Sequence, residues 1–346
     1  MKKIQVAING FGRIGRAFLK LAETQKELEV VAINDLGNVE NLAYLLKYDT
    51  AYGKSDLDIS TKEGALVING REIAFLSEKD PAKLPWGKFG VDVVVEATGI
   101  FEDYAQARVH LDAGAKRVVV TAPPHDEPPA GIAGATVLMG INDDELKTCQ
   151  ISSNASCTTN AGSPLMYILN EAIGIEKALL STTHGYTATQ SLVDSPVKGK
   201  DFRRGRAAAA NIVPSTTGAA ISMTKALPEL QGKFDGIALR VPVVTGSIVD
   251  ITFVAKRDTS AEEVNDILRT AAKDQRWKHV FTVTDEQLVS SDIIGSEFAS
   301  IADLNFTRVI GGNLVKVLAW YDNEMGYTYT LVDHVIKTGQ YAVKSE

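Results

Sequence analysis

A glycine-rich turn between two apolar segments constrains the fold of this chain more than any other feature. Residues 4–9 form a short apolar run, Gly10-Phe11-Gly12-Arg13-Ile14-Gly15 follows directly, and apolar residues then recur at helical spacing. The pattern predicts a strand, a tight turn and a helix. In such a unit the first glycine permits the turn, the second lets a pyrophosphate approach the backbone, and the third lets the helix pack on the strand. The helix N-terminus then receives the phosphates.

A second apolar strand follows the predicted helix and ends in a carboxylate. Residues 30–33 are Val-Val-Ala-Ile, and Asn34 and Asp35 come next, twenty residues beyond Gly15. A carboxylate at this place can accept a hydrogen bond from a ribose 2′-hydroxyl and repels a 2′-phosphate. The unit therefore predicts NAD rather than NADP as the cofactor. The alternative is a purely structural glycine turn with a solvated Asp35.

Strands and helices alternate through the first half of the chain. Apolar runs predict strands at residues 91–96, 117–121 and 135–139 and a helix at 102–113. Such alternation is typical of a parallel, doubly wound sheet, which binds ligands at the carboxyl ends of its strands. Thr98, Gly99 and Thr121 follow two of these strands and are candidate cofactor contacts, although turn chemistry alone would also favour them there.

The second half has a different pattern. Longer strands at residues 178–183, 234–244, 247–256 and 315–321 indicate mainly antiparallel pairing, with helices at 217–227 and 260–273. We therefore expect an α/β domain at residues 1–156 and an α+β domain at 157–321. A helix at about 322–346 is expected to pack back on the first domain, and the proline- and glycine-rich residues 126–134 are expected to form a surface loop.

Composition limits the possible partners. A chain of 346 residues exceeds the size at which one core keeps growing, which agrees with two domains. The net charge of -7 argues against nucleic acid as the main partner. No apolar run approaches the roughly 18 residues of a membrane span, and the N-terminal residues lack a signal pattern. A cytoplasmic protein without membrane association is expected.

Cys157 is the candidate nucleophile. It stands in the small, polar stretch Ser153-Asn154-Ala155-Ser156-Cys157-Thr158-Thr159-Asn160, just before an apolar run that suggests a helix. At a helix N-terminus, free N–H groups and the helix dipole favour a thiolate over a thiol. With only two cysteines and five scattered histidines, neither a disulfide scaffold nor a metal site is expected.

His184 and several arginines are the candidate partners of Cys157. His184 ends a predicted strand and would act as a base if it lay beside the cysteine; otherwise it is a surface or core histidine. Arg240 interrupts an apolar strand, where a charge is costly unless it is paired, so we expect it to bind an anion. Arg203-Arg204-Gly205-Arg206 is either a second anion site or a solvated loop. Residues 214–220 resemble a hydroxyl-rich helix cap that could cradle a phosphate.

Taken together, these residues resemble the glyceraldehyde-3-phosphate dehydrogenase family of the bacterial and eukaryotic type, along nearly the whole chain. The matching blocks are Asn9 to Arg16, Lys47-Tyr48-Asp49-Thr50, Ser153 to Asn160, Thr182 to Gln190, Ser215 to Ala220, Arg240-Val241-Pro242 and Trp320 to Tyr327.

The resemblance implies an N-terminal Rossmann domain, a C-terminal catalytic domain, a homotetramer, and oxidation of glyceraldehyde 3-phosphate with NAD and inorganic phosphate. Cys157 would form a thiohemiacetal and then a thioester, with His184 as the base. Thr187 and Arg240 would hold the C3 phosphate of the substrate. The attacking phosphate would be bound by Ser156, Thr158, Arg204, Thr217 and Gly218. The dinucleotide would contact Gly10, Gly12, Arg13, Ile14, Gly15, Asp35, Lys79, Thr98, Gly99, Thr121, Asn323 and Tyr327.

Four features depart from the common pattern of that family. Ala161 replaces a frequent second cysteine, Thr189 stands where many members have aspartate, and Lys79 stands where arginine is common. The stretch Val243-Val244-Thr245-Gly246-Ser247 replaces a usual Thr-Pro-Asn-Val-Ser. Two alternatives stay open on the sequence alone. One is an erythrose-4-phosphate dehydrogenase of the same family, and the other is a nucleotide- or RNA-binding protein with a relic active site.

Overall fold

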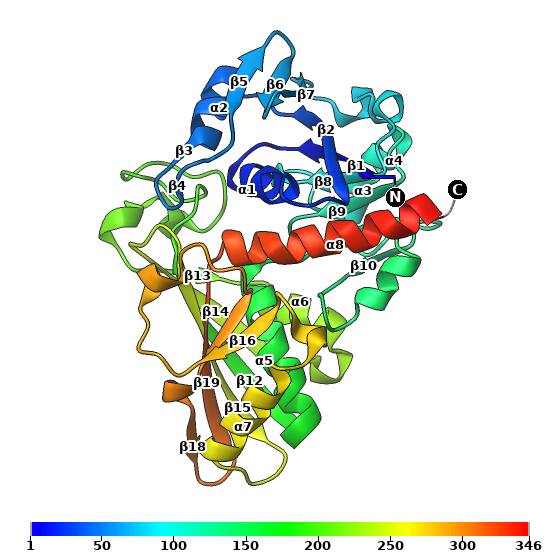
Figure 1. Cartoon of the computed structure of the whole chain (residues 1–346). Helices are drawn as coiled ribbons and strands as arrows, with labels where there is room; N and C mark the ends of the chain where they lie inside the picture. The colour runs from blue at the N-terminus through cyan, green and yellow to red at the C-terminus, as the bar shows by residue number, and fades with distance from the viewer. Residues whose placement is uncertain (1, 345–346) are drawn as a thin grey trace. The chain divides into compact units, whose positions relative to one another are not determined.

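The computed structural model describes residues 2–344, and the chain forms two compact units (Figure 1). The first unit contains the chain up to Ala155 and again from Thr328 onward, and the second contains Ser156–Tyr327. The C-terminal helix expected at about 322–346 includes residues 345 and 346, which lie outside the described part of the chain.

The first unit is built on a nine-stranded sheet with the strand order β10-β11-β9-β8-β1-β2-β7-β6-β5. Its pairs are parallel from β10 to β7, and only β7 with β6 and β6 with β5 are antiparallel. The strands are β1 (Ile4–Asn9), β2 (Leu28–Asn34), β5 (Ile59–Lys62), β6 (Ala65–Ile68), β7 (Arg71–Leu76), β8 (Val93–Glu96), β9 (Arg117–Val120), β10 (Gly134–Thr136) and β11 (Ile151–Ser153). β3 (Tyr48–Asp49) and β4 (Gly53–Lys54) form a separate small ribbon.

The helices of this unit connect the strands. They are α1 (Arg13–Ala22), α2 (Val39–Lys47), α3 (Tyr104–Ala107), α4 (Val109–Asp112) and most of α8 (Met325–Lys344). The helix predicted at 102–113 is thus two short helices, interrupted by a turn at Arg108 where the N–H of Leu111 bonds the Arg108 carbonyl. α8 packs on the sheet: a Cβ at Gly339 would overlap the side chain of Ile4, and His334 bonds Ser152 at 2.7 Å.

The direction of the crossovers reverses between β1 and β8. β1 pairs with β2 on one side and β8 on the other, so Asn9 lies in register with both Asn34 and Glu96. In an open sheet of this kind, ligands bind outside the carboxyl ends of the strands at this point. The predicted glycine turn follows β1 directly and therefore lies at that edge.

The second unit contains an eight-stranded sheet in the order β13-β14-β12-β15-β19-β17-β16, with β18 paired to β19. The pairs β12–β14 and β16–β17 are parallel and the others are antiparallel. The strands are β12 (Ile175–Gly185), β13 (Val213–Thr216), β14 (Phe234–Val241), β15 (Ser247–Ala255), β16 (Phe281–Thr284), β17 (Ser300–Asp303), β18 (Arg308–Ile310) and β19 (Leu314–Tyr321). The two sheets confirm the predicted fold class, α/β followed by a mainly antiparallel α+β unit.

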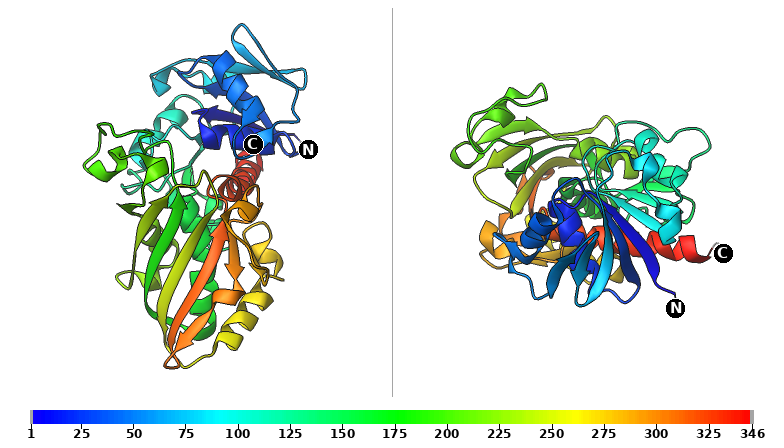
Figure 2. Two further views of the ribbon diagram at one scale, coloured as in Figure 1. Left: turned by 90° about the vertical axis from the view of Figure 1, so that its left-hand side faces the viewer. Right: turned by 90° about the horizontal axis from the view of Figure 1, so that it is seen from above.

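Helices α5 (Cys157–Ile173), α6 (Ala219–Ala226) and α7 (Ala261–Ala271) lie on one face of this sheet, as Figure 2 shows. Side chains of β12 alternate accordingly: Leu180, Thr182 and His184 are buried toward the helices, while Leu179 points to the other face and is 67% exposed. The predicted helix cap at residues 214–220 is wrong in its first part. Residues up to Thr216 form β13, because pairing with β14 satisfies their backbone, and α6 is capped by Gly218.

Short 3₁₀ helices occupy the connections. They are Pro81–Lys83, Trp86–Phe89, Asp143–Lys147, Phe202–Gly205, Ala208–Ala210, Pro228–Leu230, Gln275–Trp277, Ser290–Ile293 and Leu304–Phe306. Within residues 2–344, no helix has both the length and the apolar character needed to cross a bilayer.

Candidate active site

Cys157 is the first residue of α5, as the sequence predicted. Ser156 caps the helix, and its hydroxyl oxygen accepts a hydrogen bond from the Thr159 N–H at 3.1 Å. This cap satisfies one backbone N–H of the first turn and fixes the direction in which the helix starts. The thiol of Cys157 is only partly exposed.

His184 meets Cys157 across the interface between α5 and the sheet. Its Nε2 lies 3.3 Å from the Cys157 Sγ, although the two residues are 27 positions apart in sequence. His184 is next to last in β12, on the face that packs against the helices, and only 3% of it is exposed. The structure therefore brings the predicted nucleophile and the predicted base into hydrogen-bond contact.

Arg240 completes this cluster from the neighbouring strand. β12 and β14 run parallel with His184 in register with Arg240, so both side chains emerge on the same face. The Arg240 Nη1 lies 2.7 Å from the His184 Nδ1, and the carbonyl oxygen of Gly185 lies 2.6 Å from the same ring nitrogen. Burial and the positive charge of Arg240 lower the pKa of His184 to about 3. The imidazole is consequently neutral at physiological pH.

The thiol of Cys157 keeps its proton in the free chain. Dehydration around the sulfur raises its pKa, and this outweighs the opposing effects of Arg240, the Thr158 hydroxyl and the backbone N–H groups at the helix start. The helix N-terminus does lower the pKa, as predicted from the sequence. It is not sufficient here to generate a thiolate, so a base must remove the proton.

Tyr321 braces the start of α5 from the end of β19. Its hydroxyl lies 2.9 Å from the Thr158 Oγ1 and 2.7 Å from the Thr182 Oγ1, and the Thr182 hydroxyl is 3.1 Å from the Ile248 carbonyl oxygen. Its ring also packs edge-on against His184, with centroids 5.9 Å apart. Burial raises the pKa of Tyr321, so the phenol stays protonated. One fully buried side chain thus fixes both the nucleophile's helix and the base.

A second group of cationic and hydroxyl side chains lies at the end of the same sheet. Arg204 donates to the Thr189 Oγ1 at 3.0 Å and to the Ser215 Oγ at 2.7 Å, and the Thr189 hydroxyl contacts that of Thr187 at 3.0 Å. The hydroxyl oxygen of Thr217 accepts from the Ala219 N–H at the start of α6. Burial, and to a lesser extent the positive charge of Arg204, lower the pKa of Arg240. The two cations lie close enough to interact, and their charges add in attracting an anion.

Asn323 is held by hydroxyl groups of the loop that departs from the family pattern. The Ser247 hydroxyl donates to the Asn323 Oδ1 at 2.7 Å and itself accepts from the Gly185 N–H at 3.0 Å. Thr245 contacts the carboxylate of Asp322 at 2.8 Å. The hydroxyl groups of this loop therefore hold the Asn323 side-chain amide in one orientation. Tyr327 is buried near the start of α8.

In the first unit, the predicted cofactor residues gather at the carboxyl edge of the sheet. Gly10 has φ +95°, and a Cβ there would lie 2.6 Å from the Thr98 nitrogen, while a Cβ at Gly15 would overlap the Gly10 carbonyl oxygen. A Cβ at Gly12, in contrast, would meet no protein atom within 4 Å, which leaves the backbone open to a ligand. The Asp35 carboxylate accepts from the Phe11 N–H at 2.6 Å. This cradle fits a dinucleotide pyrophosphate and its ribose.

The remaining cofactor candidates surround that turn. Arg13 forms a bidentate ion pair with Asp49, and Ile14 follows it in the first turn of α1. Thr98 follows β8, where its N–H and hydroxyl both donate to the buried Glu96. Gly99 has φ +68°, Thr121 follows β9, and Lys79 is exposed just beyond β7.

Comparison with known proteins decides the family. Residues 4–104 match the family model "Glyceraldehyde 3-phosphate dehydrogenase, NAD binding domain", and residues 156–323 match "Glyceraldehyde 3-phosphate dehydrogenase, C-terminal domain". The glyceraldehyde-3-phosphate dehydrogenase of Streptomyces coelicolor is 45% identical over 339 residues, which cover 97% of this chain and 98% of the relative. The glyceraldehyde-3-phosphate dehydrogenase 1 of Kluyveromyces lactis is 46% identical over 96% of this chain and 98% of its own length.

The chain belongs to the glyceraldehyde-3-phosphate dehydrogenase family. This confirms the resemblance read from the sequence, and with it an NAD-dependent oxidoreductase.

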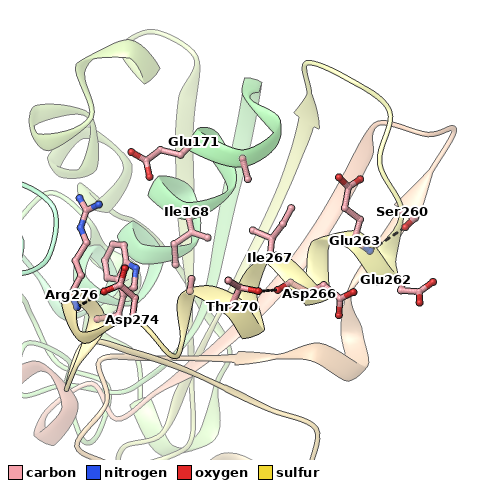
Figure 3. Close-up of a pocket in the computed structure, with 13 residues that line it drawn as sticks. Ile168, Glu171, Ser260, Glu262, Glu263, Asp266, Ile267, Thr270, Asp274 and Arg276 are labelled. Carbon is pink, nitrogen blue, oxygen red and sulfur yellow. Dashed lines mark hydrogen bonds between the residues drawn. The ribbon is translucent and has the colours of Figure 1, made fainter.

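A groove in the second unit and the other cysteine of the chain, Cys149, both lie outside the site described above. An open, acidic groove lies between α5 and α7, lined among others by Glu171, Asp266 and Arg276 (Figure 3). It lies about three to four helical turns along α5 from Cys157. Cys149 is buried, and burial raises its pKa to about 11, so its thiol is unreactive. Among residues 2–344 no cluster of side chains is arranged to hold a metal ion.

Sequence reasoning missed three supporting residues. Tyr321, Ser247 and Glu96 contact predicted site residues but carry no chemistry that a motif would single out. A signal existed for Glu96, because an acidic residue at the end of a strand that is otherwise Val-Val-Val is unusual and must be paired. Tyr321 and Ser247 lie at strand ends far along the chain from their partners, and nothing in their spacing indicates those contacts.

Proposed function

We propose that this chain oxidises D-glyceraldehyde 3-phosphate with NAD and inorganic phosphate to 1,3-bisphosphoglycerate. The observation that carries the proposal is the contact of 3.3 Å between the Cys157 thiol and the His184 imidazole, with Arg240 beside them. A thiol, a neutral base and a cation in this arrangement suit covalent oxidation of a phosphorylated aldehyde. The relatives that cover nearly the whole chain carry the glyceraldehyde-3-phosphate name, which favours that substrate over erythrose 4-phosphate.

In the first half-reaction, the Cys157 thiol passes its proton to the Nε2 of His184 while the sulfur attacks the aldehyde carbon. The oxygen of the resulting thiohemiacetal develops negative charge, for which the Cys157 backbone N–H and the protonated His184 are the donors. The protonated His184 then gives its proton to that oxygen, which completes the thiohemiacetal and restores the neutral imidazole. NAD bound at the first unit would supply the oxidant by accepting the hydride of that carbon. As the hydride leaves, His184 accepts the hydroxyl proton again, and the carbonyl of a thioester on Cys157 forms.

In the second half-reaction, inorganic phosphate attacks the thioester and releases the acyl phosphate, and the sulfur leaves as a thiolate. We assign the attacking phosphate to Ser156, Thr158, Arg204, Thr217 and Gly218, and the C3 phosphate of the substrate to Thr187 and Arg240. Arg204 and Arg240 support this because their charges reinforce each other and Arg240 has a buried Nε without a hydrogen-bond partner in the described residues.

We assign the dinucleotide to the edge of the first unit. Gly10, Gly12 and Gly15 would shape the pyrophosphate turn, and Asp35 would bind the adenosine ribose. The further contacts that we propose are Arg13, Ile14, Lys79, Thr98, Gly99, Thr121 and, for the nicotinamide group, Asn323 and Tyr327.

The test follows NADH formation from glyceraldehyde 3-phosphate with NAD, with and without phosphate or arsenate. We expect sustained turnover only when one of these anions is present. A matched Cys157→Ser variant should lose several orders of magnitude of activity and still bind NAD. Sustained turnover without either anion would contradict a phosphorylating enzyme, and full activity in Cys157→Ser would contradict the assignment of the nucleophile.

We also propose that the chain assembles as a homotetramer. The sheet face opposite to α5 carries exposed apolar side chains, among them Leu179 (67% exposed) and Ile237 (56% exposed). Exposed apolar surface of this kind on a sheet favours association with another copy. Sedimentation velocity should show a tetramer that dissociates in Ile237→Lys and persists in the control Val289→Lys, where an exposed side chain lies on a different segment. A monomeric unaltered chain would contradict the proposal.

A cytoplasmic location completes the proposal. A nucleophilic cysteine must remain unoxidised, and the cytosol keeps thiols reduced. Cell fractionation followed by immunodetection tests this expectation.

A further inference from the structure

Arg204 is oriented by two hydroxyl groups and not by a carboxylate. Its Nη1 donates to the Thr189 Oγ1 at 3.0 Å, and its Nη2 donates to the Ser215 Oγ at 2.7 Å. Both acceptors are neutral, so these hydrogen bonds fix the plane of the guanidinium without neutralising its positive charge. A guanidinium held in this way attracts any anion that can reach it.

One carboxylate oxygen lies just beyond hydrogen-bond reach of Arg204. The Asp201 Oδ2 is 4.0 Å from the Arg204 Nε, a distance at which opposite charges attract although no hydrogen bond forms. This oxygen is buried and has no hydrogen-bond partner among residues 2–344. A buried acceptor without a donor is costly, and a small movement of Asp201 toward Arg204 would supply a charge-assisted hydrogen bond.

Arg203 holds the other oxygen of the same carboxylate. Its Nε donates to the Asp201 Oδ1 at 2.7 Å, and the Arg203 side chain is 57% exposed. The hydrogen bond from Arg203, together with the charges of Arg203 and Arg204, lowers the pKa of Asp201, so the carboxylate is ionised at neutral pH. Asp201 is therefore one full negative charge that two arginines share and that only Arg203 binds through its side chain.

We propose that Asp201 is an internal counter-anion of Arg204, which competes with inorganic phosphate for this guanidinium, and that Arg203 restrains it. The inference rests on the proposed function, in which Arg204 binds the attacking phosphate, and deepens it by naming the residues that set the affinity for phosphate. Asp201 and Arg203 are positioning residues in this role, because they act through Arg204.

The two positioning residues have effects of opposite sign. The charge of Asp201 weakens phosphate binding in two ways, because it attracts Arg204 and repels the incoming anion. Without Arg203, the Asp201 carboxylate is free to turn to Arg204 and form a bidentate pair that phosphate must displace. Removing the charge of Asp201 should therefore strengthen phosphate binding, and removing Arg203 should weaken it only while that charge is present.

The first experiment measures the KM for inorganic phosphate of the full-length enzyme at saturating NAD and glyceraldehyde 3-phosphate. In Asp201→Asn we expect this KM to fall about two- to fivefold, the range that corresponds to the measured energies of exposed charge pairs. Asp201→Ser removes the same charge and should show the same fall. Damage to the fold does not produce a gain of affinity. A KM that is unchanged or higher in both variants would refute the proposal.

A matched control separates this effect from a general change of charge. Asp194 lies on the same connection between β12 and β13 and pairs with Arg206 at 2.8 Å. Asp194→Asn removes an equal charge from this connection without altering a contact of Arg204, so its KM for phosphate should match that of the unaltered chain. An equal fall in Asp194→Asn and Asp201→Asn would overturn the assignment to Asp201.

A double variant tests the restraint by Arg203. Arg203→Met should raise the KM for phosphate about two- to fivefold in the otherwise unaltered chain and should leave it unchanged when Asp201→Asn is also present. Equal increases in both backgrounds would show that Arg203 only attracts phosphate, which contradicts its role as a restraint on Asp201.

The NADH burst in the absence of phosphate distinguishes failure of this inference from failure of the proposed function. Acylation of Cys157 does not use the attacking phosphate, so the burst rate in Asp201→Asn should equal that of the unaltered chain. A changed burst rate would place the influence of Asp201 on acylation and overturn the inference. Sustained turnover of the unaltered chain without phosphate or arsenate would instead refute the proposed function itself.

Discussion

Asp35 offers a quantitative test of how the first unit selects its cofactor. Its carboxylate accepts from the Phe11 N–H at 2.6 Å and from the Gly37 N–H at 2.8 Å. It therefore holds the glycine turn in shape, and in the proposed site it would also bind the adenosine ribose. Two variants separate these roles, because Asp35→Asn keeps an oxygen acceptor for the Phe11 N–H while it removes the charge, and Asp35→Ala removes both.

The expected magnitudes follow from the contacts that each variant loses. Without a charged acceptor for the ribose 2′-hydroxyl, NAD should bind about 1.5–3 kcal/mol more weakly, or roughly ten- to a hundredfold. NADP should lose nothing from this contact and gain relief from repulsion, which reaches about 4 kcal/mol for unit charges 4 Å apart near a protein surface. Partial exposure of Asp35 reduces that value. We therefore expect the ratio of the Kd values for NADP and NAD to fall at least about tenfold in Asp35→Asn.

Isothermal titration calorimetry with NAD and NADP on the unaltered chain and both variants measures this ratio. Asp35→Ala should weaken the binding of both nucleotides more than Asp35→Asn does, because in Asp35→Ala the Phe11 N–H has no acceptor. An unchanged ratio in both variants would refute the placement of Asp35 at the ribose. Equal losses for the two nucleotides would show that Asp35 only supports the turn.

Two further predictions concern buried polar groups. Tyr321→Phe removes the hydroxyl that contacts Thr158 and Thr182. This variant should lower the free energy of unfolding by about 1–3 kcal/mol and slow the NADH burst, which thermal unfolding and stopped-flow measurements check. An unaltered burst would argue against a role of the Tyr321 hydroxyl at the active site. Burial lowers the pKa of His334 from its ordinary 6.5 to about 3, so its contribution to stability is full above pH 6.5 and is lost as the pH falls toward 3, by up to about 1.4 kcal/mol per pH unit. Hydrogen exchange of α8 measured against pH should show this loss in the unaltered chain and not in His334→Gln, and parallel curves would contradict it.

The backbone architecture could largely be predicted from the sequence because its signals are local. The turn at Gly10, the carboxylate at Asp35 and the helix that starts at Cys157 each depend on neighbours within a few residues, and the structure has them where they were expected. The errors also have local reasons. Thr216 and the residues before it carry the hydroxyls of a helix cap, yet pairing with β14 makes them a strand.

The candidate site was predictable in its residue types and not in its contacts. That His184 reaches Cys157 depends on how α5 packs on β12, and no spacing in the sequence encodes that distance. The same holds for Arg240, whose position beside the imidazole follows from the register between two parallel strands.

Trapping the acyl-enzyme tests directly whether Cys157 is acylated during the reaction. The enzyme is mixed with NAD and glyceraldehyde 3-phosphate in the absence of phosphate and arsenate, quenched in acid, digested and analysed by mass spectrometry while NADH is counted. We expect about one NADH per chain and a 3-phosphoglyceroyl group on the peptide that contains Cys157, and phosphate added before the quench should remove it. NADH formation without a covalent adduct, or an adduct on any other residue, would contradict covalent catalysis by Cys157.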